Sequence, residues 1–261
     1  MSHADVLVVL PTLGDRLESL KETIESVETQ RQDVNLRLVV ITPPSAAEAR
    51  ALALAAGADI VDDPKAGISA AINYGLAARD GETYYAWIGD DDLFRPGGLK
   101  ALLELLTAEP SAVLAFGGCD YIDGEGQTIA TNNAGALAKV LLPWGPNLIP
   151  HPGSMIRLDA LERVGGFEKE LRYAMDLDAF LKLRHLGKFV WTRTAVSAFR
   201  WHPDSLTVSN RLASSVESES IKTRHLPPAL RPISGLWNRP IRWASAFAAQ
   251  RLNARARALQ R

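Results

Sequence analysis

The first third of the chain alternates short apolar runs with longer stretches that have helical periodicity. The apolar runs lack the polar alternation of a half-exposed strand, so they predict strands buried on both faces of a parallel sheet. These runs cover residues 4–10, 36–41, 58–61 and 83–88. Helices are expected between them, at residues 17–27, 46–56 and 68–78. This order predicts right-handed crossovers and a doubly wound α/β sheet.

The rest of the pattern is less regular. Asp15 is expected to cap the first helix, and Pro96 opens another amphipathic helix. Residues 132–150 lack periodicity and hold several prolines, so we expect a loop that lies over a site. The remaining expected elements are a strand at 112–116, a hairpin at 121–129, an extended segment at 151–157, a helix at 175–185, and strands at 188–191 and 195–201.

Three consecutive carboxylates, Asp90, Asp91 and Asp92, directly follow the fourth apolar run. Adjacent carboxylates repel one another and raise each other's pKa, so we expect a cation to neutralise them, and a divalent metal is the obvious candidate. The alternative is a solvated acidic turn that caps the helix after Pro96. Ligands of doubly wound sheets bind at the carboxyl ends of the strands, where this cluster lies, and that position favours the metal.

The composition of the chain indicates which class of protein it belongs to. The chain has 261 residues, of which 47% are hydrophobic, so it is large enough to bury a substantial core. Cys119 is the only cysteine, which excludes an intrachain disulfide. No apolar run approaches the ~20 residues that span a bilayer, and the start of the chain lacks the pattern of a secretion signal. We therefore expect a cytoplasmic protein.

Charge is distributed unevenly along the chain. The last acidic residue is Glu219, and nine Lys and Arg side chains follow it. Aromatic and aliphatic residues such as Trp237, Trp243 and Phe247 interleave with these arginines, which is typical of an amphipathic helix on an anionic membrane surface. The alternative is a helix docked on the protein or on a second subunit of a homo-oligomer. The expected location is thus cytoplasmic and peripheral at the inner face of the membrane, through residues 222–261, with no nucleic acid partner.

Four segments, taken in order, resemble family 2 glycosyltransferases with the GT-A fold. They are Pro11-Thr12, the helix from Gly67 through Asn73, the Asp90–Asp92 cluster with Pro96 behind it, and Gly165-Gly166-Phe167 followed by Asp176 and Asp178. The resemblance extends from about residue 6 to about residue 205. It implies an α/β, Rossmann-like, mostly parallel central sheet flanked by helices, with a small antiparallel portion. The expected C-terminal helical tail lies outside the resemblance and rests on its own composition.

The same resemblance implies a division of the chain. Residues 1–210 are expected to form the GT-A domain, with a nucleotide-sugar-binding half at 1–118 and an acceptor half at 119–210. Residues 211–261 are expected to form a basic amphipathic helical tail.

The implied activity is transfer of a sugar, with inversion, from a nucleotide-diphosphate donor to a hydroxyl of a glycan or lipid-linked glycan. Mn²⁺ or Mg²⁺ on the diphosphate would be held by Asp91, Asp92 and His202. Asp176 matches the general base, and Asp178 is expected on the helix surface or behind the site. His151 and Ser154 fall on the acceptor side. The expected nucleotide-sugar contacts are Pro11, Thr12, Asp63, Gly67, Asn73, Asp90 and Asp91.

The sequence also departs from the family pattern. Thr42-Pro43-Pro44 stands where the family has a base-recognising Asp, so Asp62 or Asp63 is the substitute we consider, and Ile72 replaces an expected Arg. Two alternative functions are a sugar nucleotidyltransferase and an inactive sugar-nucleotide-binding scaffold. The first requires a glycine-rich phosphate loop, of which only Gly14 is present. The intact acidic cluster, together with Asp176, argues against the second.

Overall fold

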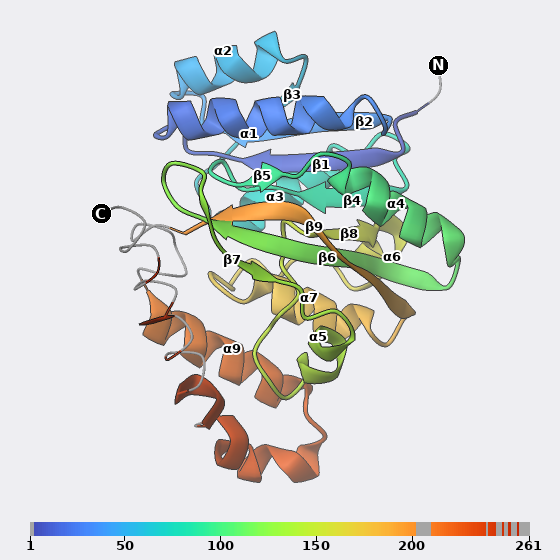
Figure 1. Ribbon diagram of the computed structural model, residues 1–261, viewed down its shortest axis with the longest axis vertical. Coiled ribbons are helices and arrows are strands. Elements are labelled where there is room, and N and C mark those ends of the chain that lie inside the picture. Colours follow the sequence, from blue (N-terminus) through green and yellow to red (C-terminus); the bar gives the residue numbers. More distant parts are fainter. Residues whose placement is uncertain are drawn as a thin grey trace.

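The computed structural model describes residues 3–201, 210–238, 240–243, 247, 250–251 and 255. Within these ranges the strands form one sheet of nine in the order β3-β2-β1-β4-β8-β6-β9-β5, with β7 paired to β6 (Figure 1). The first four strands pair in parallel and confirm the predicted doubly wound half. They are β1 (Val6–Pro11), β2 (Leu36–Thr42), β3 (Asp59–Asp62) and β4 (Tyr84–Trp87).

The other five strands supply the antiparallel portion. β8 pairs antiparallel with both β4 and β6, β5 with β9, and β7 with β6, whereas β6 and β9 run parallel. Their bounds are β5 (Leu93–Phe94), β6 (Ala112–Ile122), β7 (Thr128–Asn132), β8 (Ser154–Arg157) and β9 (Lys188–Arg200). The mostly parallel sheet with its antiparallel part agrees with the predicted GT-A architecture.

Helices cover both faces of the sheet because the strands are apolar on both faces. Val6, Val8 and Leu10 of β1 pack in the same cluster as α1 (Leu17–Gln30), α2 (Ala47–Ala55) and α4 (Gly98–Ala108). Leu7 and Val9 point the other way and pack with the second set of helices. That set comprises α3 (Ile68–Ala77), α5 (Ala136–Leu141), α6 (Leu158–Arg163) and α7 (Met175–Leu183). The two cores together confirm the predicted parallel-sheet burial.

Three local expectations were wrong. Asp15 does not cap α1, because the residue before this helix is Arg16 and no side chain caps it. The segment 132–150 is not all loop, since it contains α5. The two strands expected near the end of the sheet are one continuous strand, β9, which follows β6 through several shifts of register.

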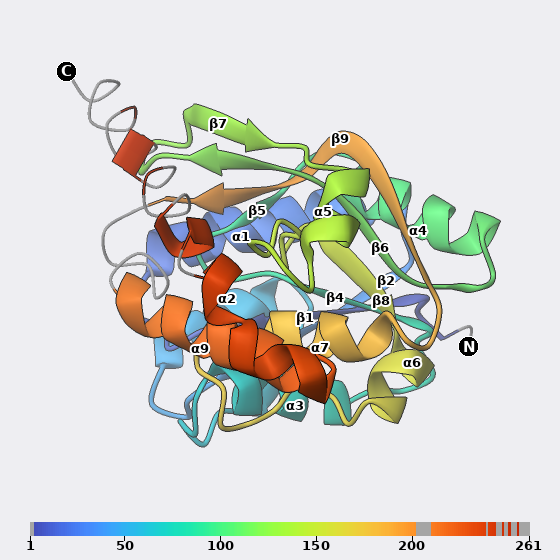
Figure 2. The same cartoon turned by 90° about the horizontal axis from the view of Figure 1, so that it is seen from below.

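The C-terminal segment begins with α9 (Arg211–His225). α9 packs on α7, and Ile221 and Leu226 are buried. Figure 2 shows α9 and the helical segment after it on the α7 side of the molecule. No helix in the described ranges combines the length and apolar character needed to cross a bilayer.

Candidate active site

The acidic cluster lies at the carboxyl end of β4, beside the end of β1. Thr12, which follows β1, donates a hydrogen bond from Oγ1 to Oδ2 of Asp90 at 2.6 Å and accepts one from the backbone N–H of Gly14. Burial raises the pKa of Asp90 to about 6, although the Thr12 hydrogen bond acts in the opposite direction. The predicted residues Thr12 and Asp90 are therefore in direct contact.

Arg16 is a functional residue that the sequence interpretation missed. Its Nη1 atom lies 2.6 Å from Oδ2 of Asp91 and 3.8 Å from Oδ1 of Asp90. The guanidinium thus sits between two carboxylates that would otherwise repel each other. Arg16 could have been found from its place in the loop after β1. The loops that follow neighbouring parallel strands lie at the same edge of the sheet, so this loop was expected near the acidic cluster after β4.

Asp92 is directed into the protein. It is 1% exposed, and its Oδ1 accepts a hydrogen bond from the backbone N–H of Arg200 at 3.0 Å. Burial and the charge of Asp91 raise its pKa well above the ordinary value. Arg200 also donates from Nε to the carbonyl of Asp91 at 2.9 Å, so the end of β9 is attached to the acidic loop at two points. His202 follows two residues later and lies outside the described residues.

The chemistry of this cluster suits a hard divalent cation. Asp90 and Asp91 already converge on one positive group, and carboxylate oxygens are the ligands that Mg²⁺ and Mn²⁺ take. Over the part of the chain that the structure describes, no group of three or more His, Cys, Asp and Glu side chains is arranged to hold a metal ion. The metal roles of Asp91, Asp92 and His202 stay predictions.

Asp176 begins α7 on the other side of the site. Its Oδ1 accepts a hydrogen bond from the backbone N–H of Leu177 at 2.7 Å, and its Oδ2 accepts one from Nδ2 of Asn147 at 3.0 Å. Burial raises its pKa to about 6, against the lowering effect of these hydrogen bonds, and the charge of Glu217 adds to the rise. Such a carboxylate can accept a proton near neutral pH. Asn147 was not predicted, although its segment was expected to cover a site.

Glu217 of α9 binds the segment that leads into α7. Its carboxylate accepts hydrogen bonds from the backbone N–H groups of Tyr173 and Ala174, both at 2.7 Å, and from that of Arg172 at 3.2 Å. Ala174 directly precedes the first residue of α7, so this carboxylate lies near the positive end of the helix dipole and fixes the chain just before Asp176. The C-terminal segment therefore contributes directly to the geometry of the site.

We expected Asp178 either on the helix surface or behind the site. The structure excludes the helix surface. Asp178 is fully buried between α7 and α9, with Oδ1 2.8 Å from Nε2 of His225 and Oδ2 2.6 Å from Nζ of Lys182. Burial acts to raise its pKa, but the contacts with His225 and Lys182 outweigh it and lower the pKa to about 2. Arg224 adds a third cation at 3.0 Å. Asp178 thus joins the two helices behind Asp176.

His151 is buried against β4, the strand that leads into the acidic cluster. Its ring stacks on Trp87 at 4.3 Å between centroids, and its Nε2 lies 3.2 Å from the hydroxyl of Tyr85. Burial lowers its pKa to about 3, so the imidazole is neutral at pH 7. Ser154 Oγ donates to the carbonyl of His151 at 2.8 Å. Burial and the charge of Asp176 raise the pKa of Tyr85, which places Asp176 on the same side of β4 as this cluster.

Asn73 is engaged with the Gly-Gly-Phe segment. Its side-chain amide donates to the carbonyl of Phe167 at 2.6 Å and accepts from the N–H of Phe167 at 3.0 Å. Gly166 has a φ of +70°, and a Cβ there would lie 2.8 Å from Oδ1 of Asn73, which explains the glycine. Two motifs of the resemblance are thereby joined. Gly67, with a φ of +101°, directly precedes α3, and its donor contact stays a prediction, as does that of Asn73.

Asp63 and Thr42 lie at the carboxyl ends of β3 and β2. Asp63 is 8% exposed and accepts a hydrogen bond from the backbone N–H of Lys65 at 2.8 Å. Thr42 Oγ1 is buried and has no hydrogen-bond partner among the described residues. It stands where the family places its base-recognising residue, next to Pro11 on β1 in the sheet order. Thr42 is thus a second candidate that the sequence interpretation did not include.

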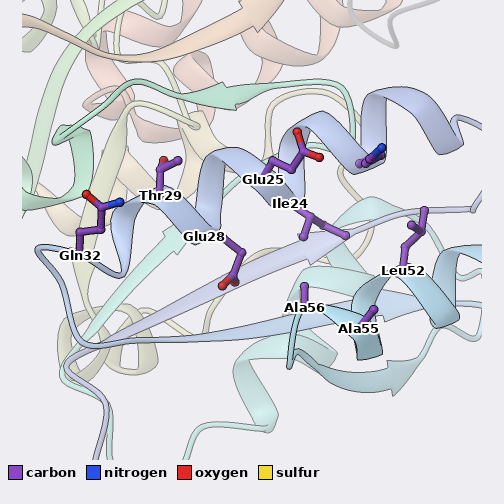
Figure 3. A pocket seen from close by; sticks show the side chains of 9 residues that line it. Ile24, Glu25, Glu28, Thr29, Gln32, Leu52, Ala55 and Ala56 are labelled. Carbon is purple, nitrogen blue, oxygen red and sulfur yellow. The ribbon is translucent and has the colours of Figure 1, made fainter.

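A surface groove of about 530 Å³ between α1 and α2 is separate from this site. Figure 3 shows Glu28 of α1 directed toward Ala55 of α2 and Ala56 just after it, with Gln32 just beyond the end of α1. These residues belong to the ends of helices that lead into β2 and β3, so they lie toward the amino ends of the strands. The groove is therefore at the opposite edge of the sheet from Asp90 and Asp91.

Solved structures share this fold at low sequence identity. The TarS 1-349 fragment of S. aureus in complex with UDP-GlcNAc matches with a TM-score of 0.66 and 12% identity over 87% of this chain and 69% of that one. The mannosyltransferase PcManGT from Pyrobaculum calidifontis, in complex with GDP-Man and Mn²⁺, gives 0.61 and 18% over 99% and 81%. Glucosyl-3-phosphoglycerate synthase from Mycobacterium tuberculosis, with Mn²⁺, UDP and glucosyl-3-phosphoglycerate, gives 0.57 and 20% over 84% and 78%. All three are GT-A glycosyltransferases.

Sequence comparison identifies the protein family to which the chain belongs. No curated protein sequence matches this chain significantly. The family model for Glycosyl transferase family 2 matches residues 7–165, which is more than half of the 261 residues. This range includes Thr12, Asn73, the acidic cluster and the first glycine of the Gly-Gly-Phe segment. The chain therefore belongs to glycosyltransferase family 2 and has the GT-A fold.

Proposed function

We propose that this glycosyltransferase moves a sugar from a nucleotide-diphosphate donor to an acceptor hydroxyl, with inversion at the anomeric carbon. One observation carries the proposal. Asp176, with a pKa of about 6, acts through its charge on Tyr85 of β4, and β4 leads directly into the acidic loop, so a second carboxylate lies near the strand that carries the first set. Separate carboxylates for the leaving diphosphate and for the acceptor proton are what an inverting transfer needs.

The acidic loop is the proposed donor site. Asp91 would hold a divalent metal, with Asp92 and His202 as the other proposed ligands, and the metal would act as a Lewis acid on the diphosphate. Asp90 would face the ribose or the sugar. The rest of the proposed donor surface is Pro11, Thr12, Asp63, Gly67 and Asn73. The neighbours crystallised with UDP-GlcNAc, with GDP-Man and Mn²⁺, or with UDP and Mn²⁺ support a nucleotide-sugar donor and a metal here.

Asp176 is the proposed general base. Its raised pKa keeps a basic oxygen available near neutral pH, and the hydrogen bond from Asn147 orients the carboxylate. The acceptor hydroxyl would approach from the side of His151 and Ser154. The neutral imidazole of His151 adds no charge there, so we assign it to shaping the acceptor side.

A glycan or lipid-linked glycan of the cell envelope is the proposed acceptor. We propose a cytoplasmic enzyme that associates with the inner face of the membrane through residues 222–261, and that residues 1–118 and 119–210 serve donor and acceptor respectively. The block of cations after Glu219 supports the membrane part of this proposal.

A panel of nucleotide sugars tests the donor assignment. The melting temperature of the full chain is measured with each donor, with and without Mn²⁺. A true donor is expected to stabilise the folded protein only with the metal, by about 2.7 kcal/mol at a hundredfold excess over its Kd. Nucleotide release is then followed for every donor that binds. If no donor shifts the melting temperature, the proposal is wrong, and binding without release would favour an inactive scaffold.

A further inference from the structure

Large apolar side chains are exposed on two segments that are distant in sequence. Leu137 and Val140 on α5 and Trp144 just after it form the first set, and Leu236, Trp243 and Phe247 in the C-terminal segment form the second. These six side chains are between 41% and 79% exposed. Single exposed apolar residues are ordinary, but a contiguous group of this kind marks a contact surface.

A ring contact brings the two segments together. The indole of Trp144 meets that of Trp237 edge to face, with 5.8 Å between centroids and an interplanar angle of 72°. Trp237 directly follows Leu236, so the contact brings Trp144, the last residue of the first set, next to the start of the second set. We name these six residues, with Trp237, the apolar face.

The charge of the C-terminal segment limits what can cover the apolar face. No acidic residue follows Glu219, whereas nine Lys and Arg residues do. Arg251 lies over the ring of Phe247 at 4.6 Å, so a cation directly borders an exposed aromatic residue of the face. Arg242, which precedes Trp243, is paired with Glu219, but the segment after Glu219 still carries an excess of cations. Apolar side chains bordered by such an excess complement a surface with negative headgroups over an acyl layer.

We propose that the apolar face docks on an anionic lipid bilayer and that α5 and Trp144 form part of this surface together with the C-terminal segment. The aromatic side chains would enter the headgroup region, and the arginines would stay at the level of the phosphates.

The position of the apolar face also points to the class of acceptor, and this step rests on the proposed function. Asn147, which orients Asp176, lies three residues after Trp144 in the same loop. A bilayer bound at Trp144 would therefore lie beside the acceptor side of the site. An acceptor hydroxyl carried on a lipid anchor could reach Asp176 from that surface, so we assign lipid-linked acceptors to this enzyme.

Vesicle sedimentation tests the docking. The full chain is mixed with vesicles of phosphatidylcholine alone or with about one third phosphatidylglycerol, at low and high salt. We expect binding to the anionic vesicles only, weakening as salt screens the cations. The double substitution Leu236→Ser with Trp243→Ser should reduce the partition coefficient by about tenfold or more, because two exposed apolar side chains are lost.

Matched substitutions outside the apolar face show whether any change of an exposed side chain weakens vesicle binding. Leu54→Ser removes a side chain that is 63% exposed on α2, away from the apolar face, and should leave binding unchanged. Arg251→Glu should weaken binding, whereas Lys21→Glu on α1 should weaken it much less. Absence of binding to anionic vesicles, or equal binding by the double variant, would overturn the proposal. A dimer in light scattering that the double variant converts to a monomer would assign the face to a second copy and also overturn it.

Measuring donor turnover tests the transferase function independently of membrane docking. The Leu236→Ser with Trp243→Ser variant should release nucleotide from the donor at the wild-type rate without vesicles, because neither residue contacts the site residues described above. A wild-type protein that binds vesicles but turns over no donor would contradict the transferase assignment and leave the docking intact.

Discussion

Asp159 and Asp176 occupy equivalent positions in α6 and α7. Each carboxylate lies in the first turn of its helix and accepts a hydrogen bond from the backbone N–H of the next residue, at 2.8 Å for Asp159 and 2.7 Å for Asp176. Asp176 is also held by Asn147, and burial raises the pKa of Asp176 to about 6. Asp159 is therefore an example of an ordinary helix-terminal carboxylate, and Asp176 is a candidate base.

The substitution Asp176→Asn is expected to reduce transfer by about 10²–10⁴-fold, which is the usual contribution of a general base. Donor affinity should change little, because Asp176 does not belong to the acidic loop. Steady-state transfer and calorimetric donor binding are the measurements. Asp159→Asn serves as the matched control and should retain full activity. Transfer by Asp176→Asn within about tenfold of wild type would rule out the base assignment.

The pH dependence of transfer should reflect the same carboxylate. Asp176 acts as a base only when ionised, so kcat/KM should fall below about pH 6 and level off above it. Glu217→Gln removes a negative charge that raises the pKa of Asp176, and the acidic limb should then move to lower pH. Tyr85 faces Asp176 from β4 but is uncharged over this range.

A purely structural role of Glu217 would lower activity at all pH values without moving the limb. Glu219→Gln, on the same helix but paired with Arg242, is the control and should leave the limb in place. An unchanged limb in Glu217→Gln would contradict the electrostatic link to Asp176.

The substitution Asp91→Ala should abolish metal-dependent binding of the donor, since it removes the proposed main metal ligand. Isothermal calorimetry with the donor in the presence and absence of Mn²⁺ is the measurement. The control is Asp120→Ala on β6, which removes a carboxylate that is paired with Arg95. If the donor affinity of Asp91→Ala equals that of the wild type, the acidic loop has another role.

Arg16→Gln should strengthen the binding of Mn²⁺ in the absence of donor. The guanidinium contacts Asp91 at 2.6 Å and competes with a metal for the same oxygens. The gain is expected to be about fivefold or less, because the ion pair is partly exposed. Metal titration by calorimetry measures it, with Arg31→Gln, which breaks an ion pair elsewhere on the surface, as the control. Weaker binding of Mn²⁺ would show that Arg16 supports the metal instead of opposing it.

Gly98→Ala should destabilise the fold by about 2–3 kcal/mol, as overpacking does. A Cβ at this position would lie 2.2 Å from the carbonyl oxygen of Val196, so the start of α4 would have to move away from β9. Gly124→Ala is the control, because nothing lies within 4 Å of its Cβ. Urea denaturation gives both free energies of unfolding, and an equal stability of the two variants would contradict the close packing.

The parallel half of the fold followed from the sequence because its signal is local. Each of the first four strands is an apolar run, and both faces of β1 are covered. β9 was divided in two because Thr192, Arg193 and Thr194 interrupt its apolar pattern. β6 pairs with β9 on both sides of this interruption, at Trp191 and at Ala195, with a shift of register between them, and such pairing is not visible in local composition. α5 has only six residues, which is too short for a reliable period.

The site was predictable where a motif carries the residue and not where a distant contact does. Thr12, Asp90 and Asp176 belong to segments of the family resemblance. Arg16 reaches Asp91 across 75 residues, and Asn147 reaches Asp176 across 29. The sequence left Asp178 either on the helix surface or behind the site for the same reason, because its burial depends on His225, 47 residues further along the chain.

The contact between Asp92 and Arg200 has a consequence for how the protein can be divided. These residues are 108 positions apart, so the buried carboxylate of the donor half receives its hydrogen bond from the last strand of the sheet. A chain that ended before β9 would leave this carboxylate buried without that partner, which costs several kcal/mol. The acidic loop therefore reaches its final shape only after nearly the whole catalytic domain has been synthesised and folded. The acidic loop and the last strand of the sheet form one cooperative unit, and a fragment that ends before β9 is not expected to bind nucleotide sugar.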